Sequence, residues 1–179
     1  MECFKEFPRS IGILTTLAGI VYLMAGMALT VSIGAWFAGG FAVLYILVHY
    51  FHYPRHACAN CYYYGRHCIS LKGKSAARIF RRGRESGFHS GMKLAMKGVY
   101  LVWIYPFVVL IGALARGRPI YFTDLLLSAI LIVLMVMRQL MRRSLGCRVC
   151  IMRDECPNVG PDPRRTVKID SGAPVGPGA

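Results

Sequence analysis

The chain opens with a long stretch of apolar positions that charged side chains do not interrupt. Residues 11–48 are 38 consecutive positions without Asp, Glu, Lys or Arg. As one α-helix this stretch would measure about 57 Å, nearly twice the roughly 30 Å hydrocarbon core of a bilayer. Two spans joined by a tight turn fit that thickness. The segment SIGAWFAGG at 32–40 supplies glycines for the turn, and it places Trp36 and Phe37 at the lipid interface.

Two shorter apolar runs follow at 98–115 and 119–137. Each is about 18 residues long, near the lower limit for a membrane-spanning helix. Only the segment RGR lies between them, so they form a hairpin. A soluble helical core would show polar faces at a period of 3.6 residues, and these runs show none. The sequence therefore predicts an all-α integral membrane protein with four transmembrane helices.

The placement of the basic residues predicts the orientation of these spans. The chain has 22 Lys and Arg residues and a net charge of +14. Of these residues, 20 lie in 1–10, 54–97 and 138–179, which share one side of a four-span protein, and 2 lie in 116–118. The positive-inside rule then places both termini and the long loop in the cytoplasm, in a multi-pass protein of the cell membrane. Basic segments beside spans ordinarily meet anionic lipid, which makes nucleic acid an unlikely partner.

The expected organisation has six segments. They are a cytoplasmic N-terminus (1–10), a transmembrane hairpin (11–53), a basic Cys-rich cytoplasmic loop (54–97), a second transmembrane hairpin (98–138), a Cys-rich cytoplasmic segment (139–156) and a disordered tail (157–179). The tail is rich in Pro and Gly and has no periodicity. In the loop, basic side chains at 72–84 surround a short apolar patch. A helix there would lie on the membrane surface and bind anionic lipid, or it would dock an acidic partner protein.

Two cysteine clusters carry the candidate chemistry. HACANCYYYGRHC at 56–68 reads C-x2-C-x6-C, and CRVCIMRDEC at 147–156 reads C-x2-C-x5-C. A C-x2-C turn lets two thiolates converge on one metal while backbone N–H groups point at the sulfurs. The predicted metal ligands are Cys58, Cys61, Cys68, Cys147, Cys150 and Cys156. All lie on the predicted cytoplasmic side, where a reducing environment disfavours structural disulfides.

Antiparallel packing can bring the ends of the second and fourth spans together, and with them the two cysteine clusters. The six cysteines and the nearby histidines then allow three metal arrangements. In the first, one zinc ion is bound by Cys58, Cys61, Cys147 and Cys150. In the second, each of two zinc ions is bound by three cysteines and a histidine such as His56 or His67. In the third, four thiolates hold an iron–sulfur cluster. Reduced cysteines that only fill small gaps are the alternative without a metal.

Two histidines near the end of the second span are candidate cofactor ligands. His49 and His52 are three residues apart, so they share one face of an α-helix, with His56 on the same face if the helix continues past Pro54. They could hydrogen-bond a quinone. They could equally be interfacial histidines with wet tips.

Four spans with C-x2-C pairs resemble membrane thiol–disulfide oxidoreductases that pass electrons to quinone. In that family the working cysteines serve the oxidising face, whereas the charge bias here places every cysteine on the other side, so no residue role is carried over. The leading hypothesis is a non-catalytic subunit of a membrane complex, which either transfers electrons (iron–sulfur) or docks a partner (zinc). A thiol–disulfide or quinone oxidoreductase and a metal-handling protein are the alternatives. The chain has no phosphate-binding loop, catalytic triad signature or paired carboxylates.

Overall fold

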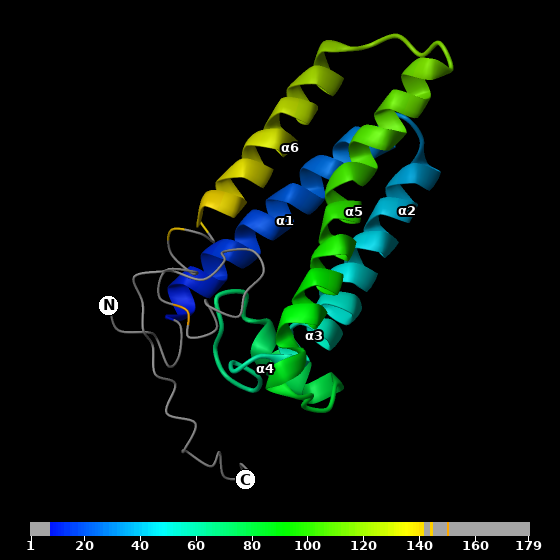
Figure 1. Ribbon diagram of the computed structural model, residues 1–179. Helices are drawn as coiled ribbons and strands as arrows, with labels where there is room; N and C mark the ends of the chain where they lie inside the picture. The colour runs from blue at the N-terminus through cyan, green and yellow to red at the C-terminus, as the bar shows by residue number, and fades with distance from the viewer. Residues whose placement is uncertain (1–7, 142–143, 145–149, 151–179) are drawn as a thin grey trace, which may run out of the picture.

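The computed structural model describes residues 8–141, 144 and 150. These residues form helices joined by turns and loops, and they include no strand. Four helical segments are long and apolar enough to cross a membrane: Arg9–Val31, Ala35–Asn60, Glu85–Ala115 and Phe122–Met141. They form an elongated bundle (Figure 1). The prediction of an all-helical chain with four helices suited to spanning a membrane is therefore confirmed.

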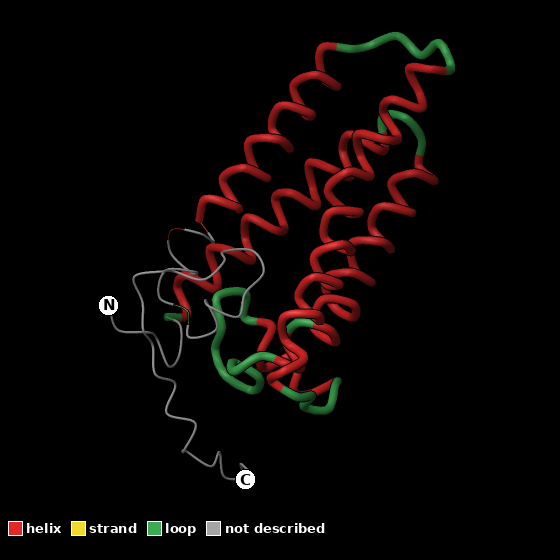
Figure 2. Tube along the Cα trace, viewed as in Figure 1, coloured by secondary structure: helices red, strands yellow, loops and turns green. Residues whose placement is uncertain are grey.

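The α-helices are α1 (Arg9–Val31), α2 (Ala35–Ile46), α3 (Tyr53–His56), α4 (Lys72–Ile79), α5 (Phe88–Ala115) and α6 (Phe122–Met141). A π-helical segment, Leu47–His52, joins α2 to α3, and 3-10 turns lie at Cys58–Asn60 and Glu85–Gly87. Figure 2 shows loops at both ends of the bundle. We call the end that carries α3, α4 and the start of α1 the loop end. The opposite end, with the α1–α2 and α5–α6 connections, is the turn end.

Helix α1 lies at the centre of the packing, because it contacts α2, α5 and α6. Three glycines at seven-residue intervals, Gly12, Gly19 and Gly26, are buried along it. The ring of Phe41 on α2 lies where a side chain on Gly26 would be. Helix α2 therefore packs directly on the backbone of α1, the close approach that small residues permit between membrane helices.

Tyrosine hydroxyls join neighbouring helices of the bundle. They donate to backbone carbonyls of a neighbouring helix: Tyr22 to Trp103 (3.2 Å), Tyr45 to Gly19 (2.9 Å) and Tyr105 to Phe37 (3.1 Å). In a bilayer, which offers no water to polar groups, such hydroxyls have to be satisfied within the protein. The rings of Tyr22 and Tyr45 are buried in the core, and the ring of Tyr105 packs against it.

A buried carboxylate ties the two turns together at the turn end. The side chain of Asp124 is fully buried, and its Oδ2 lies 3.3 Å from Nη2 of Arg118. The hydroxyl of Ser32 donates to Oδ1 of Asp124 at 3.1 Å, and the backbone N–H of Tyr121 donates to Oδ2 at 3.3 Å. Because Ser32 belongs to the α1–α2 connection, one carboxylate holds both hairpins together.

Two helix boundaries differ from the sequence-based expectation. The break between the first two spans is shorter than 32–40, because α2 already begins at Ala35. Helix α5 begins at Phe88, within the segment expected to be loop. Its first turns bury Phe88, Met92 and Ala95 against the loop end, and this three-to-four-residue spacing continues the helix beyond the fully apolar run.

Candidate metal centre

The second span continues as helix past a proline. In a regular α-helix, the ring of Pro54 would clash with the carbonyl of Tyr50, four residues earlier. The wider π-helical turn Leu47–His52 lies at this point of the chain. Helical backbone therefore continues through His56, and the first cysteine cluster follows directly on the end of this helix.

Cys58 and Cys61 lie on a tight turn at that helix end. Cys58 begins the 3-10 turn, and the backbone N–H of Cys61 donates to the carbonyl of Cys58 at 3.3 Å. Cys58 is buried, and Cys61 is half-buried. The C-x2-C spacing thus forms the compact turn that the sequence predicts for it.

Cys68 lies in the loop that leads into α4, and its sulfur is held by the backbone. The N–H of Gly73 donates to Sγ of Cys68 at 3.3 Å, and Oγ of Ser70 lies 3.4 Å from the same sulfur. A side chain on Gly73 would collide with the carbonyls of Tyr63 and Arg66. The loop therefore closes around the sulfur only with glycine at this position.

Cys150, from the second cysteine cluster, also lies at the loop end. Two groups of buried side chains, which we call the loop-end clusters, fill this region: Ala57, Phe88, Met92, Ala95 and Met96 in one, and Tyr63 and Cys68 in the other. Cys61 and Cys150 both pack against each of these clusters. The structure thus brings a residue that follows the fourth span to the loop that follows the second.

The described residues place four of the six predicted metal ligands at the loop end. These are Cys58, Cys61, Cys68 and Cys150, whereas Cys147 and Cys156 lie outside the described residues. Within the described part of the chain, no group of three or more His, Cys, Asp or Glu side chains is arranged to hold a metal ion. The structure therefore gathers the donors in one region without forming a complete ligand set from the described residues alone.

The two other histidines considered as metal ligands lie in the same region. The ring of His56 is 4.8 Å from that of His52, and the carbonyl of His56 accepts from the side-chain amide of Asn60 at 2.9 Å. His67 is half-buried, and its Nε2 is buried without a hydrogen-bond partner among the described residues. Neither imidazole joins the cysteines in a ligand group that the described residues complete.

Basic and aromatic side chains surround the cysteines. Nη1 of Arg66 donates to the hydroxyl of Tyr62 at 2.8 Å, and its guanidinium lies 4.9 Å from the centre of that ring. Nζ of Lys72 lies 5.2 Å from the ring centre of Tyr53. These contacts fix two positive charges next to the first cysteine cluster. Such charges would offset the negative charge of bound thiolates.

The two histidines predicted to bind a cofactor lie in different cavities. His49 is buried, its ring stacks on Tyr45 at a centroid distance of 4.2 Å, and it lines a cavity of about 600 Å³. His52 lines a separate cavity of about 380 Å³, and its Nε2 forms a 3.1 Å hydrogen bond to the carbonyl of Leu94 on α5. The π-helical segment Leu47–His52 replaces the regular α-helix in which residues three apart share a face.

Arg138 is a polar residue of the interior that the sequence reasoning missed. It counted as part of the basic tail, but it belongs to the last turn of α6, is buried, and lines the same cavity as His49. It lies seven residues after the fully buried Leu131, so the two side chains share one face of α6.

No family model, curated protein or solved structure matches the chain. At the loop end the chemistry is that of thiols, which are soft ligands for zinc or iron and are nucleophilic when ionised. Their gathering at one end of four apolar helices is the feature that a functional account has to explain.

Proposed function

We propose that the two cysteine clusters hold a metal ion or an iron–sulfur cluster at the loop end, and that the protein is a docking or electron-transfer subunit of a membrane complex. One observation carries this proposal: Cys150 packs against the same loop-end clusters as Cys61. A bound metal would join the end of the fourth span to the end of the second.

The ligand set draws on both clusters. Cys58 and Cys61 supply the pair on the helix-end turn, and Cys150 supplies a third thiolate from the other side. The fourth ligand is Cys68, which is described, or Cys147 or Cys156, which lie outside the described residues. Zinc takes four such ligands in a closed tetrahedral site that stabilises the fold, and iron–sulfur clusters are likewise held by four thiolates.

A backbone hydrogen-bond donor and two positive charges at the loop end would stabilise thiolate ligands. The Gly73 N–H donates to Sγ of Cys68, and hydrogen bonds of this kind to sulfur tune metal–thiolate sites. Arg66 and Lys72 supply positive charge next to the loop. A tetrathiolate zinc site has a net charge of about −2, which these cations offset.

The proposed setting is the cell membrane, with the loop end in the cytoplasm. The excess of Lys and Arg beside this end supports that orientation. Basic side chains are exposed along and after α4, namely Lys74, Arg78, Arg81, Arg82 and Arg84, and the apolar Ile79 is exposed among them. Such a surface suits the anionic headgroups of the lipid bilayer.

The experiment that tests this function combines metal analysis with an absorption spectrum of protein purified without oxygen. A colourless protein with stoichiometric zinc supports a docking subunit. A visible absorption band that bleaches on reduction, with stoichiometric iron, supports an electron-transfer subunit. Protein that contains neither metal in stoichiometric amount contradicts the proposal. Cys3→Ser is the matched control, because Cys3 belongs to neither cluster and this variant is expected to keep the metal.

A further inference from the structure

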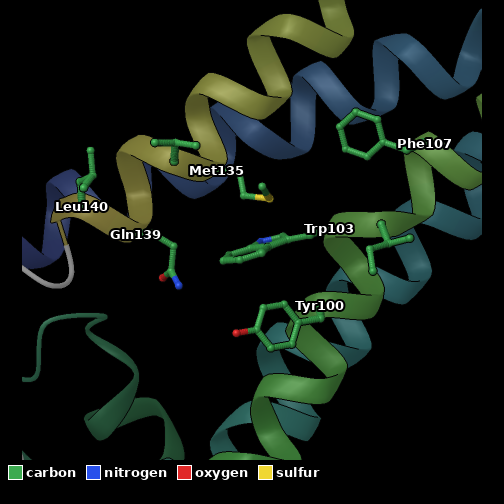
Figure 3. Close-up of a pocket in the computed structure, with 8 residues that line it drawn as sticks. Tyr100, Trp103, Phe107, Met135, Gln139 and Leu140 are labelled. Carbon is green, nitrogen blue, oxygen red and sulfur yellow. The ribbon is translucent and has the colours of Figure 1, made fainter. Parts of the chain in front are cut away.

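A second site candidate lies between α5 and α6. The two helices diverge here and leave a groove of about 500 Å³ (Figure 3). It is lined by Tyr100, Trp103, Ile104, Phe107, Met135, Val136, Gln139 and Leu140. Its volume falls within the roughly 300–1,000 Å³ range of small-molecule sites. The groove is largely apolar, with a few polar groups at one place.

Trp103 gives the groove an unmet hydrogen-bonding requirement. Its side chain is 4% exposed, and Nε1 has no hydrogen-bond partner among the described residues. Figure 3 shows the indole ring projecting from α5 toward α6, with Met135 and Gln139 on the facing side. Trp103 lies five residues into the apolar run that begins at Gly98, or about 8 Å along the helix. At that depth the bilayer supplies no water to accept the indole proton.

The other lining groups define what can accept that proton. None of the eight lining residues is charged, so the groove does not match a phosphate headgroup. Tyr100 packs edge-on against Trp103 at a centroid distance of 5.6 Å, and Phe107 lies one turn further along α5. The side-chain amide of Gln139 adds an NH₂ donor group and a carbonyl acceptor. A neutral, planar ligand with carbonyl oxygens and an apolar tail satisfies all of these features.

We propose that this groove binds a membrane-soluble quinone. One ring carbonyl accepts the Nε1–H of Trp103, the Gln139 amide donates to the other polar edge of the ring, and the isoprenoid tail leaves toward the lipid. The aromatic walls pack on the ring. The assignment concerns binding alone and does not depend on the metal site at the loop end.

The chain offers a direct optical test, because it contains only two tryptophans. Trp36→Phe leaves Trp103 as the sole indole, and Trp36 is 93% exposed at the turn end, so its replacement leaves the groove unchanged. Decylubiquinone is titrated into this variant in phospholipid nanodiscs while tryptophan emission is recorded. We expect saturable quenching. The converse variant, Trp103→Phe, reports only Trp36 and is expected to show the weak, non-saturating quenching of random collisions.

A second pair of variants tests the polar contact. Gln139→Leu in the Trp36→Phe background removes the amide at nearly constant volume, and the apparent dissociation constant should rise about tenfold. Met137→Leu is the matched control, because Met137 is an exposed neighbour outside the lining, and it should bind as the parent does.

Three results would overturn the assignment. One is emission of Trp103 that responds to decylubiquinone no differently from that of Trp36. Another comes from nanodiscs made with brominated phospholipid, whose acyl chains quench tryptophan. If they quench Trp103 and added decylubiquinone does not restore the emission, the groove is a lipid site. The third is Trp103 emission that depends on the number of protein copies per nanodisc, which would make it a contact between copies of this chain.

Discussion

Cys61 and Cys150 pack against the same two clusters of buried side chains at the loop end. Cys61 follows the second span and Cys150 follows the fourth, so these contacts bridge the two helical hairpins. At the opposite end, Asp124 bridges the same hairpins by accepting a hydrogen bond from Ser32, and Arg118 of its own hairpin neutralises it. The bundle is thus joined at both ends, by a polar contact at the turn end and, in our proposal, by a metal at the loop end.

The Asp124 contact should contribute measurably to stability. Asp124→Asn removes the negative charge that faces Arg118. The side chain of Arg118 is only 19% exposed, so water cannot fully replace the lost counter-ion. We expect a loss of about 2 kcal/mol in the free energy of unfolding, less than for a fully buried pair. Thermal unfolding in detergent measures it. Arg116→Gln, at an exposed position of the same connection, is the control and should change stability little. Equal stability of the two variants would show that the contact contributes nothing.

Gly73 should be intolerant of any side chain. Gly73→Ala places a methyl group against the carbonyls of Tyr63 and Arg66, so the loop has to open and Sγ of Cys68 loses its N–H donor. A loss of about 2 kcal/mol or more is expected in the same unfolding measurement. Gly39→Ala is the control, because nothing lies within 4 Å of its Cβ position on α2. A stable Gly73→Ala protein that retains its metal would contradict the described geometry of this loop.

The proposed orientation predicts which residues react from outside the cell. A cysteine introduced by Arg116→Cys at the turn end should react with a membrane-impermeant maleimide in intact cells. A cysteine introduced by Arg82→Cys at the loop end should react only after the membrane is permeabilised, and should then add labelling beyond that of the native cysteines in the parent protein. Both positions are exposed in the structure, so burial does not limit the reaction. The reverse pattern would invert the topology that the positive-inside rule predicts.

The exposed arginines near α4 should select anionic lipid. Arg78→Gln, Arg81→Gln and Arg84→Gln together remove three charges, each contributing about 1 kcal/mol near an anionic surface. Native mass spectrometry should then find fewer anionic lipids bound and the same number of zwitterionic ones. Arg116→Gln, at the other end of the bundle, should leave both numbers unchanged. If it lowers anionic lipid binding as much as the triple variant does, the surface near α4 is not selective.

The four helices long enough to span a membrane were predictable, because the charge-free runs and the thickness of a bilayer set their number and length. Helix ends were less so: α5 extends back to Phe88 because packing of Met92 and Ala95 at the loop end continues it into a charged segment. His49 and His52 line different cavities because they lie in a π-helical segment, and no residue pattern in the sequence predicts that segment. The groove at Trp103 depends on how α6 packs against α1, and this is a property of the whole bundle.

The metal content of single-cysteine variants shows whether the two cysteine clusters bind one metal together. If the two clusters share one site, Cys61→Ser and Cys150→Ser should each lose the bound zinc or iron, whereas Cys3→Ser should retain it. The double variant Cys61→Ser with Cys150→Ser should lose no more metal than either single variant. Full retention of metal in one of the single variants, or losses that add in the double variant, would show that the clusters do not share a site.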